Sequence, residues 1–581
     1  MRTALRSNLN PVTARRDRVP ELLRRVWAIV FAGSVFAAAG FAQINGNAKN
    51  SNTAHQPPNG YVGNHACASC HASIYNSYAR TPMAHASGDA IENLAPADFV
   101  HEKSKVHYRI YSEGNTAWLS FERPGDPAAT GKRQLLYAIG SGRRGRSYLF
   151  AVDGFVFESP VNWYADGHRW DMAPAYGMAR EIPLNLPAYP ECLRCHTSGM
   201  QSPINGSQNE YPMPLFTQDG VGCERCHGPG AAHAKGAAIV NPMKLTPDRR
   251  DSVCMQCHLE GSVAIERAGH HASDFRPGDV LDDYIRHYVL SAGQAPGLGA
   301  NSQFEALAQS KCKKKSGDSM SCMSCHDPHS YPSADERASF YRGKCLACHG
   351  VAFGVKHHPD KPDCTACHMP PSLSTDIAHT EVTDHRIPRL PGLSPELLEE
   401  PVAKQTSSSS LLPFPYSKEA ADDVRDLALA WESLAGSGTP EAASQADRLL
   451  PLTAKQLPND PAVLSGLAYV ELSHHAQDRA RELYQKALAL DPTLIDAATN
   501  LGVIEARSGH LSAAVALWQG AFIRAPGNSS IGMNLARTFC EAGQMKDARL
   551  YVSRVLHFNP DLTEARKLLQ HLNADPPDCR R

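Results

Sequence analysis

The spacing of apolar residues changes along the 581-residue chain and divides it into regions of different texture. Between residues 100 and 170, apolar and polar positions alternate, and Gly, Pro and Asp interrupt the runs. A period of two is typical of strands with one buried face. The sequence therefore predicts a small antiparallel β unit from the runs VHYRIYSE, TAWLSFER, RQLLYAIG and SYLFAVDGFVFES.

The C-terminal part is rich in Ala and Leu at helical spacing, and its pattern recurs every 34 residues. Three sets of residues keep this spacing: Pro458, Pro492, Pro526 and Pro560; Ala480, Ala514 and Ala548; and Leu467, Leu501 and Leu535. Such a pattern resembles the tetratricopeptide repeat, a helix–turn–helix unit. It predicts an α-solenoid over residues 417–575, with three clear copies at 460–561. We also expect an earlier degenerate copy at 420–457 and a capping helix at 562–573.

The stretches between and before these regions carry little periodicity. Residues 190–390 hold many Pro and Gly, and residues 388–416 contain a Ser run and several Pro, which is typical of a linker. Near the N-terminus, Arg24 and Arg25 precede an apolar run that ends in small residues. This predicts a secretory signal peptide over 1–42, followed by a flexible lead over 43–60.

The signal peptide predicts a periplasmic or otherwise extracytoplasmic protein with no stable membrane span after cleavage. An uncleaved membrane anchor is the alternative, because about 17 apolar residues can just cross a bilayer. The formal net charge is −1, so the overall charge gives no reason to expect a nucleic-acid partner.

Cysteine and histidine are concentrated in one part of the chain. The sequence has 17 Cys and 27 His, and most of both lie between residues 43 and 390. Fourteen of these Cys form seven Cys-x-x-Cys-His motifs, numbered here 1 to 7: Cys67–Cys70–His71, Cys192–Cys195–His196, Cys223–Cys226–His227, Cys254–Cys257–His258, Cys322–Cys325–His326, Cys345–Cys348–His349 and Cys364–Cys367–His368.

This pattern is the attachment signature of c-type haem. Residues i and i+3 share one face of a helical turn, so the two thiols can each add to one vinyl group. The following His then lies under the iron as its proximal ligand. The sequence therefore predicts seven covalently attached haem c groups.

Three other chemistries use paired cysteines. A zinc site needs four ligands, and a His does not regularly follow its second Cys. Disulfides form outside the cytoplasm, but they do not require seven histidines. A thioredoxin-like site has one such motif in an α/β context. Seven copies behind an export signal favour haem.

Seven haems in about 320 residues leave roughly 45 residues for each, too few for separate apolar shells. We therefore expect a multihaem domain over 61–387 in which the haems form much of the core and pack closely. The expected fold class is mainly α, with the small β unit and the repeat solenoid.

Each iron has a second axial face, and an imidazole there gives a low-spin haem that only transfers electrons. The best candidates for these distal ligands lie in loops beside the motifs: His233, His329, His357 or His358, His379 and His385. For the first haem, His65, Met83 and His85 remain open, and a Met ligand would raise its potential. His270, His271 and His287 are further candidates.

The region 60–390 resembles a multihaem cytochrome c family. That family includes the tetrahaem electron carrier of nitrifying bacteria and, more distantly, hydroxylamine oxidoreductase and the pentahaem and octahaem nitrite reductases. The resemblance is carried by YVGNHACASCH, CERCHGPGAAH, SCMSCHDPH and CTACHMP. The nitrite reductases use a Cys-x-x-Cys-Lys motif, which is absent from this sequence, and no eighth Cys-x-x-Cys-His motif is present.

The first functional expectation is an electron-transfer protein that accepts electrons from a quinol oxidase or another cytochrome, while the repeats dock a protein partner. The second is an enzyme with one open-site haem that acts on a small nitrogen or sulfur compound. The third is a repeat scaffold whose haem domain senses redox state.

Overall fold

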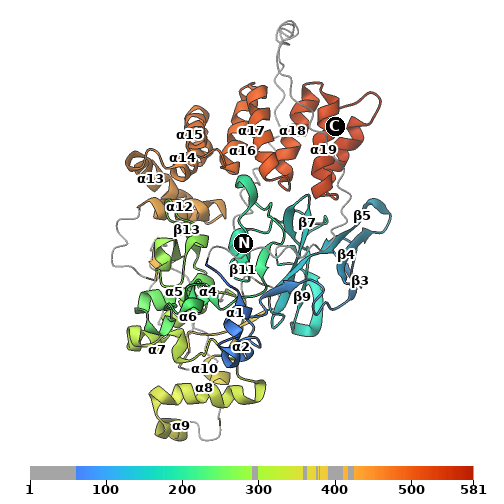
Figure 1. The fold of residues 1–581 in the computed structure, drawn as a ribbon. Helices are drawn as coiled ribbons and strands as arrows, with labels where there is room; N and C mark the ends of the chain where they lie inside the picture. Colours follow the sequence, from blue (N-terminus) through green and yellow to red (C-terminus); the bar gives the residue numbers. More distant parts are fainter. Residues whose placement is uncertain are drawn as a thin grey trace.

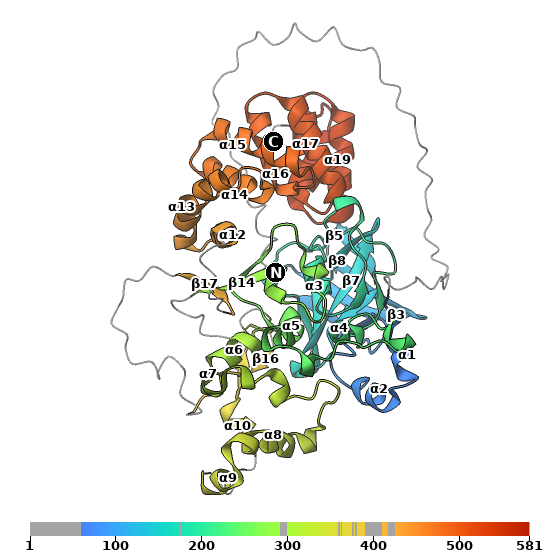
Figure 2. The same ribbon diagram turned by 60° about the vertical axis from the view of Figure 1, so that its left-hand side comes forward.

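The computed structural model describes residues 60–174, 176–290, 299–357, 361, 363–374, 377, 380–389, 410–415 and 424–579. The predicted signal peptide, nearly all of the lead and most of the linker lie outside these residues. C-terminal helices form one end of the molecule, a β-rich region adjoins them, and helices carrying motifs 6 and 7 form the other end (Figures 1 and 2). Among the described helices, none has the length and apolar character needed to cross a membrane.

The predicted β unit consists of two antiparallel sheets. The first has the order β2-β3-β4-β5, with bounds Ala97–His101, Val106–Glu113, Thr116–Arg123 and Asp126–Leu135. The second has the order β1-β6-β7-β9-β10 with β8 paired to β7; its bounds in chain order are Ser87–Asp89, Tyr137–Ile139, Gly145–Val152, Phe155–Glu158, Val161–Tyr164 and Arg169–Met172. The runs VHYRIYSE and TAWLSFER are β3 and β4 in full, so this prediction is confirmed.

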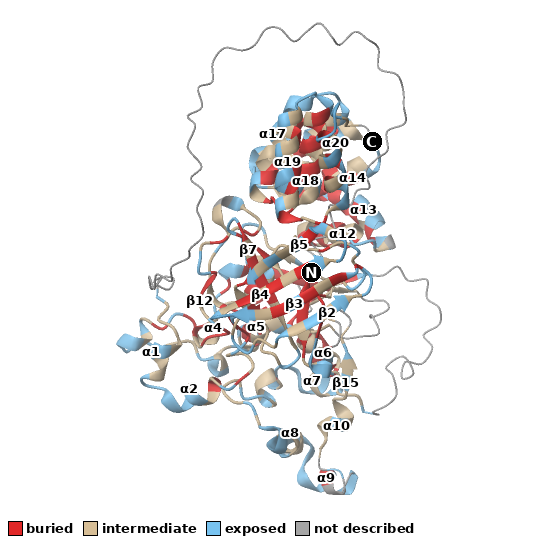
Figure 3. Cartoon of the chain, turned by 90° about the vertical axis from the view of Figure 1, so that its right-hand side faces the viewer, coloured by how far each residue is buried: buried red, intermediate tan, exposed pale blue. Residues whose placement is uncertain are grey.

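Alternation along these strands produces one shared core. On β3, Val106, Tyr108 and Ile110 are buried, and residues between them are partly or fully exposed. Phe150 and Phe157 from the second sheet belong to the same cluster. Figure 3 shows this buried band crossing the sheets.

The region that carries motifs 2 to 7 is built from short elements. Its helices are α3 (Pro190–Leu193), α4 (Glu224–His227), α5 (Pro247–His258), α6 (Gln303–Gln309), α7 (Lys311–Ser316), α8 (Ala334–His349), α9 (Val351–His357) and α10 (Thr365–His368). Motif 1 lies between α1 (Asn64–Ala68) and α2 (Ala72–Tyr78). The strands are β11 (Ser198–Met200), β12 (Phe216–Gln218), β13 (Val263–Glu266), β14 (Ile285–Leu290), β15 (Pro371–Leu373) and β16 (Glu381–Thr383).

At the end of the predicted linker, the structure has a strand where the sequence predicted a linker. Residues Leu411–Phe414 form strand β17, which pairs antiparallel with β14. Leu411 and Phe414 are both buried. A run of four apolar residues that includes Pro413 was too short a signal to distinguish this strand within a Pro- and Ser-rich segment.

The repeat prediction is confirmed at the level of the helices. Three helix pairs are α14 (Pro461–Ser473) with α15 (Gln477–Leu490), α16 (Ile495–Arg507) with α17 (Leu511–Arg524), and α18 (Ser529–Glu541) with α19 (Met545–Phe558). The degenerate copy is α12 (Val424–Gly436) with α13 (Pro440–Gln456), and the capping helix is α20 (Thr563–Leu572). First helices begin at 461, 495 and 529, which keeps the spacing of 34.

Small residues permit the helices of a repeat to pack closely. A Cβ at Gly502 would lie 2.3 Å from Nε1 of Trp518, which is buried and donates to the carbonyl of Thr499. Ala480, Ala514 and Ala548 are fully buried at the same repeat position. The recurring small residue therefore has a direct steric cause.

The repeat array is fastened to the β unit by a buried carboxylate. Asp561, just before α20, is fully buried and forms ion pairs with Arg123 at 2.5 Å and Arg566 at 2.9 Å. It also accepts a hydrogen bond from the backbone N–H of Ile182 at 2.8 Å. Nearby, Phe558 enters the apolar cluster of the β unit and contacts Phe157.

A second contact joins the first repeat to the sheet β13-β14-β17. Arg267 forms an ion pair with the buried Asp426 at 2.7 Å, and Arg425 donates to the carbonyl of Glu266. Tyr288 and Leu411 belong to the same apolar cluster as α12 to α16. The repeats and the motif-bearing region therefore share a core.

The last turn of the chain is tied to the repeats by a disulfide. Cys540 on α18 is bonded to Cys579, with a Cα–Cα distance of 5.8 Å. Cys540 lies inside a repeat helix and is buried. These two cysteines lie outside the motifs, and an unassigned pair in a chain that is predicted to be exported was the available signal.

We predict that Asp561→Asn lowers the free energy of unfolding by about 3 kcal/mol, because it leaves two partly buried guanidinium groups without their shared carboxylate. Urea unfolding followed by far-UV circular dichroism measures this. Asp153→Asn is the control, since Asp153 pairs with His557 at an exposed site and should change the value by less than about 1 kcal/mol. Equal losses in both variants would contradict the role given to Asp561.

Candidate functional site

The motifs adopt the local geometry that haem attachment needs. The backbone N–H of the motif His donates to the carbonyl of the first Cys in four of them: His71 to Cys67 (2.9 Å), His227 to Cys223 (3.0 Å), His326 to Cys322 (2.9 Å) and His368 to Cys364 (2.9 Å). In motifs 4 and 6 the same residues end the helices α5 and α8. One helical turn therefore places both thiols and the imidazole together.

All fourteen motif thiols are free in the structure, whereas Cys540 and Cys579 are bonded. Free thiols paired within a turn, each pair followed by an imidazole, suit the formation of two thioethers. The donor set therefore fits haem c.

Six of the predicted ligand imidazoles are held through Nδ1. The acceptors are the carbonyls of Val240 for His227, Ala237 for His233, Pro388 for His368 and Thr383 for His385, and the side chains of Gln303 for His258 and Tyr341 for His326. A carbonyl only accepts, so Nδ1 carries the proton there and Nε2 keeps its lone pair. This is the tautomer that binds a metal through Nε2.

Three motif histidines face a second imidazole from another segment. The ring centroids of His71 and His233 are 6.2 Å apart and the rings are 9° from parallel. His227 and His329 are 5.8 Å apart at 10°. His326 and His385 are 6.2 Å apart at 32°.

These separations match two axial ligands of one metal ion. A metal–nitrogen bond of about 2 Å and about 1.2 Å from that nitrogen to the ring centre place two opposing centroids about 6 Å apart. Two rings in direct stacking contact would have their centroids closer together than this. The three pairs therefore have room for an iron between them.

The partner of His71 was not among the three side chains considered for the first haem. His233 follows motif 3, far from motif 1 in the sequence, yet its ring lies opposite His71. Met83 lies in the turn that precedes β1, where its carbonyl accepts from the N–H of Val221. The structure thus places Met83 beside motif 3 and gives it no described contact with His71.

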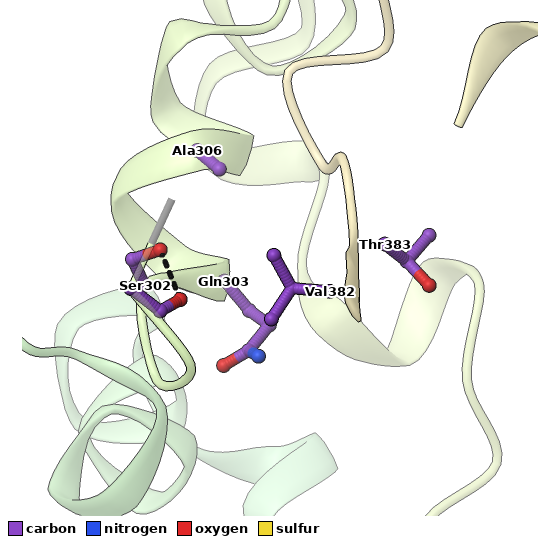
Figure 4. Close-up of a pocket in the computed structure, with 6 residues that line it drawn as sticks. Ser302, Gln303, Ala306, Val382 and Thr383 are labelled. Atoms are coloured by element: carbon purple, nitrogen blue, oxygen red, sulfur yellow. Dashed lines mark hydrogen bonds between the residues drawn. The ribbon is translucent and has the colours of Figure 1, made fainter. Parts of the chain in front are cut away.

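His258 and His385 are positioned by two elements that meet at a small depression. Gln303 on α6 holds His258, and Thr383 on β16 holds His385. Side chains of Gln303, Ala306 and Val382 line the depression between these elements, as Figure 4 shows. It encloses no space for a water molecule, so its role is packing.

The remaining predicted ligands have other surroundings. The ring of His349 lies 5.2 Å from that of Phe353, which stacks on His357 at 4.1 Å. The Nδ1 atom of His196 is buried without a hydrogen-bond partner in the described residues. His358 and His379 lie outside the described residues.

Burial keeps several of these imidazoles neutral. It lowers the pKa of His326 to about 4, with His385 adding to the effect, and that of the buried His287 to about 3. Burial likewise lowers the pKa of His258 and His385. A neutral imidazole is the form that binds a metal.

Contacts between cysteines of different motifs join all seven sites. The thiols make side-chain contacts in four pairs: Cys67 with Cys223, Cys195 with Cys257, Cys254 with Cys322, and Cys345 with Cys364. Cys325 interacts electrostatically with Cys348. Together with the His227–His329 pair, these contacts connect motifs 1–3–5, 5–4–2 and 5–6–7.

Cys312 lies in this network without belonging to a motif. It is free and half-buried, burial raises the pKa of its thiol, and its electrostatic neighbours include Cys348. A free thiol, a disulfide partner and an iron ligand are the roles open to such a cysteine from the sequence, and the structure supports a free thiol.

Sequence reasoning missed the side chains that contact the ligand imidazoles, including Gln303 and Tyr341. Each is an ordinary polar residue whose role depends on a distant partner.

Comparison with known proteins supports the reading of the motifs. The family profile "Cytochrome c554 and c-prime" matches residues 171–228. The multiheme cytochrome MtrA of Shewanella baltica is 26% identical over 187 residues, which is 28% of this chain and 54% of MtrA. The dissimilatory sulfite reductase MccA of Wolinella succinogenes is 22% identical over 384 residues, 56% of this chain and 53% of MccA.

Cytochrome c-554 of Nitrosomonas europaea is 39% identical over 90 residues, 12% of this chain and 37% of the relative. The chain thus spans about half or less of the length of these curated relatives. Among solved structures, a MamA structure covers 26% of this chain and 78% of its own, at 23% identity and a TM-score of 0.23. Taken with the motifs, these sequence matches support the interpretation of the chain as a multihaem c-type cytochrome with covalently bound haem.

We predict that His329→Ala converts one low-spin haem per chain to a high-spin haem, because the imidazole opposite His227 is lost. Electron paramagnetic resonance of the oxidised holoprotein measures the spin state, and carbon monoxide binding to the reduced protein measures the open site. His168→Ala is a matched control, since His168 is exposed in the β unit. An unchanged spectrum in His329→Ala would rule out the His227–His329 pairing.

Proposed function

We propose that this protein is an exported heptahaem c-type cytochrome that transfers electrons along a chain of closely packed, mostly bis-His haems. The observation that carries the proposal is the set of three facing imidazole pairs, each separated by the space that one iron needs. The two imidazoles of a pair would hold a haem iron from both sides, which favours electron transfer over ligand chemistry.

Each bound haem c would supply a one-electron iron couple at its attachment turn. The residues of the chain bind, orient and enclose it. The fourteen motif cysteines would form the thioethers, and the motif histidines would be the proximal ligands. Nδ1 hydrogen bonds fix the orientation of the rings and strengthen them as ligands.

The geometry supports His233, His329 and His385 as distal ligands of the haems on motifs 1, 3 and 5, respectively. His358 and His379 stay proposed distal ligands for other haems. Met83 stays an expectation, and its place beside motif 3 makes it less suited to the first haem than His233. Contact between the motifs supports close packing, because thiols from different sites touch.

We place the protein in the periplasm or another extracytoplasmic location, in line with the predicted signal peptide. Its redox partners would be a quinol oxidase or other cytochromes. The repeat helices would dock a protein partner, because their ends already contact the β unit while exposed apolar side chains remain on their outer surfaces. These side chains are Leu452, Leu490, Leu511, Ile523 and Leu550.

A second candidate is an oxidoreductase with one open-site haem that acts on a small sulfur or nitrogen compound. The similarity to the sulfite reductase MccA favours it, because that match extends over 56% of this chain. The facing imidazole pairs argue against an open site at motifs 1, 3 and 5.

The test is a quantified electron paramagnetic resonance spectrum of the purified, oxidised protein, with haem counted by mass on the same sample. We expect seven haems and no high-spin signal, because the three facing imidazole pairs support ligation from both sides. One high-spin haem per chain would instead favour the oxidoreductase. A mass with far fewer than seven haems would contradict the proposed function itself.

A further inference from the structure

We propose that Glu224, inside motif 3, is a positioning residue for the haem of motif 1. It would hold together the two segments that carry His71 and His233. This inference rests on the proposed function, since it concerns the axial ligands of a bound haem.

The carboxylate of Glu224 binds three backbone N–H groups from two distant segments. Oε1 accepts from Val62 at 2.9 Å and from Gly230 at 2.7 Å, and Oε2 accepts from Gly63 at 2.8 Å. Glu224 is only 7% exposed. A single carboxylate oxygen therefore bridges the approach to motif 1 and the loop that leads to His233.

Both bridged segments are next to an axial ligand. Val62 and Gly63 directly precede α1, which carries the first cysteine of motif 1. Gly230 lies three residues before His233, and the ring of His233 is fixed by the carbonyl of Ala237. A shift of either segment would change the 6.2 Å separation of the two imidazoles.

Neighbouring hydrogen bonds join the same two parts of the chain. Asn64 Oδ1 accepts from the N–H of Cys223 at 2.8 Å, and Gln218 Oε1 accepts from the N–H of Asn64 at 3.0 Å. The N–H of Ala231 donates to the carbonyl of Gly60 at 2.9 Å. Glu224 is the charged member, and hydrogen bonds to an ionised acceptor are the stronger ones.

Packing around Gly230 is tight. A Cβ at Gly230 would lie 3.0 Å from Cγ2 of Val62 and 3.2 Å from Oε1 of Glu224, so these side chains would have to shift by a few tenths of an ångström. Gly230→Ala therefore disturbs the contact between the two segments without changing any charge. It is a second variant, which disturbs the contact between the two segments sterically.

The experiment compares the full-length holoprotein with the variants Glu224→Gln and Gly230→Ala, and with His233→Ala as the reference for a lost ligand. Haem is counted by mass, spin state by electron paramagnetic resonance, and open sites by carbon monoxide binding to the reduced protein. We expect all variants to keep seven haems, because attachment is local to each motif. One haem per chain should become high-spin and bind carbon monoxide, as in His233→Ala.

Gly177→Ala is the matched control, since Gly177 is exposed and a Cβ there meets nothing within 4 Å. It should stay fully low-spin. If Glu224→Gln and Gly230→Ala both stay low-spin while His233→Ala changes, the inference is overturned and the proposed function stands. If His233→Ala also stays low-spin, the His71–His233 pairing falls and the inference with it. A wild-type protein with few haems would overturn the proposed function and the inference together.

Discussion

In the proposed function, the fold of the motif-bearing region depends on bringing a second imidazole opposite a motif histidine, as in the three facing pairs. One helical turn delivers two thiols and one imidazole, but the opposing imidazole has to come from elsewhere and stop about 6 Å away. The chain meets this by crossing its segments: the ring opposite His71 follows motif 3, and the ring opposite His227 follows motif 5. Short helices and loops suit this task better than long regular elements, because each has to deliver one side chain to a distant site.

The parts of the fold that could be predicted are those that depend on local sequence patterns, and the contacts between distant segments could not be predicted. Strands β3 and β4 and the helices of the repeats follow periods of 2 and 34 residues, which are local properties of the sequence. The seven attachment turns are equally local. Pairing of His71 with His233 depends on a contact across about half of the motif-bearing region, and no spacing encodes it. Strand β17 escaped prediction for a related reason, since only its pairing with β14 makes it a strand.

The repeats are less independent than a linker-connected module. Asp561 and Phe558 bind the last repeat to the β unit, and Asp426 binds the first to the β13-β14-β17 sheet. Fastening at both ends restricts rotation of the array relative to the motifs. A partner held by the repeats would therefore meet the haem region in a defined orientation, which matters because the rate of electron transfer depends on the distance between redox centres.

Motif 4 interacts with motif 3 through Cys254 and Cys226, and with motifs 2 and 5 through its other contacts. Motif 5 is likewise a meeting point. It adjoins motif 3 through His329, motif 4 through Cys322 and motif 6 through Cys325. From it, one path ends at motif 1, another at motif 2 and a third at motif 7. A linear wire joins one donor to one acceptor, whereas an arrangement with three ends is a junction. With haems at the seven motifs, as proposed, such a junction would permit one protein to collect electrons from two sources, or to divide them between two destinations, without any change in its shape.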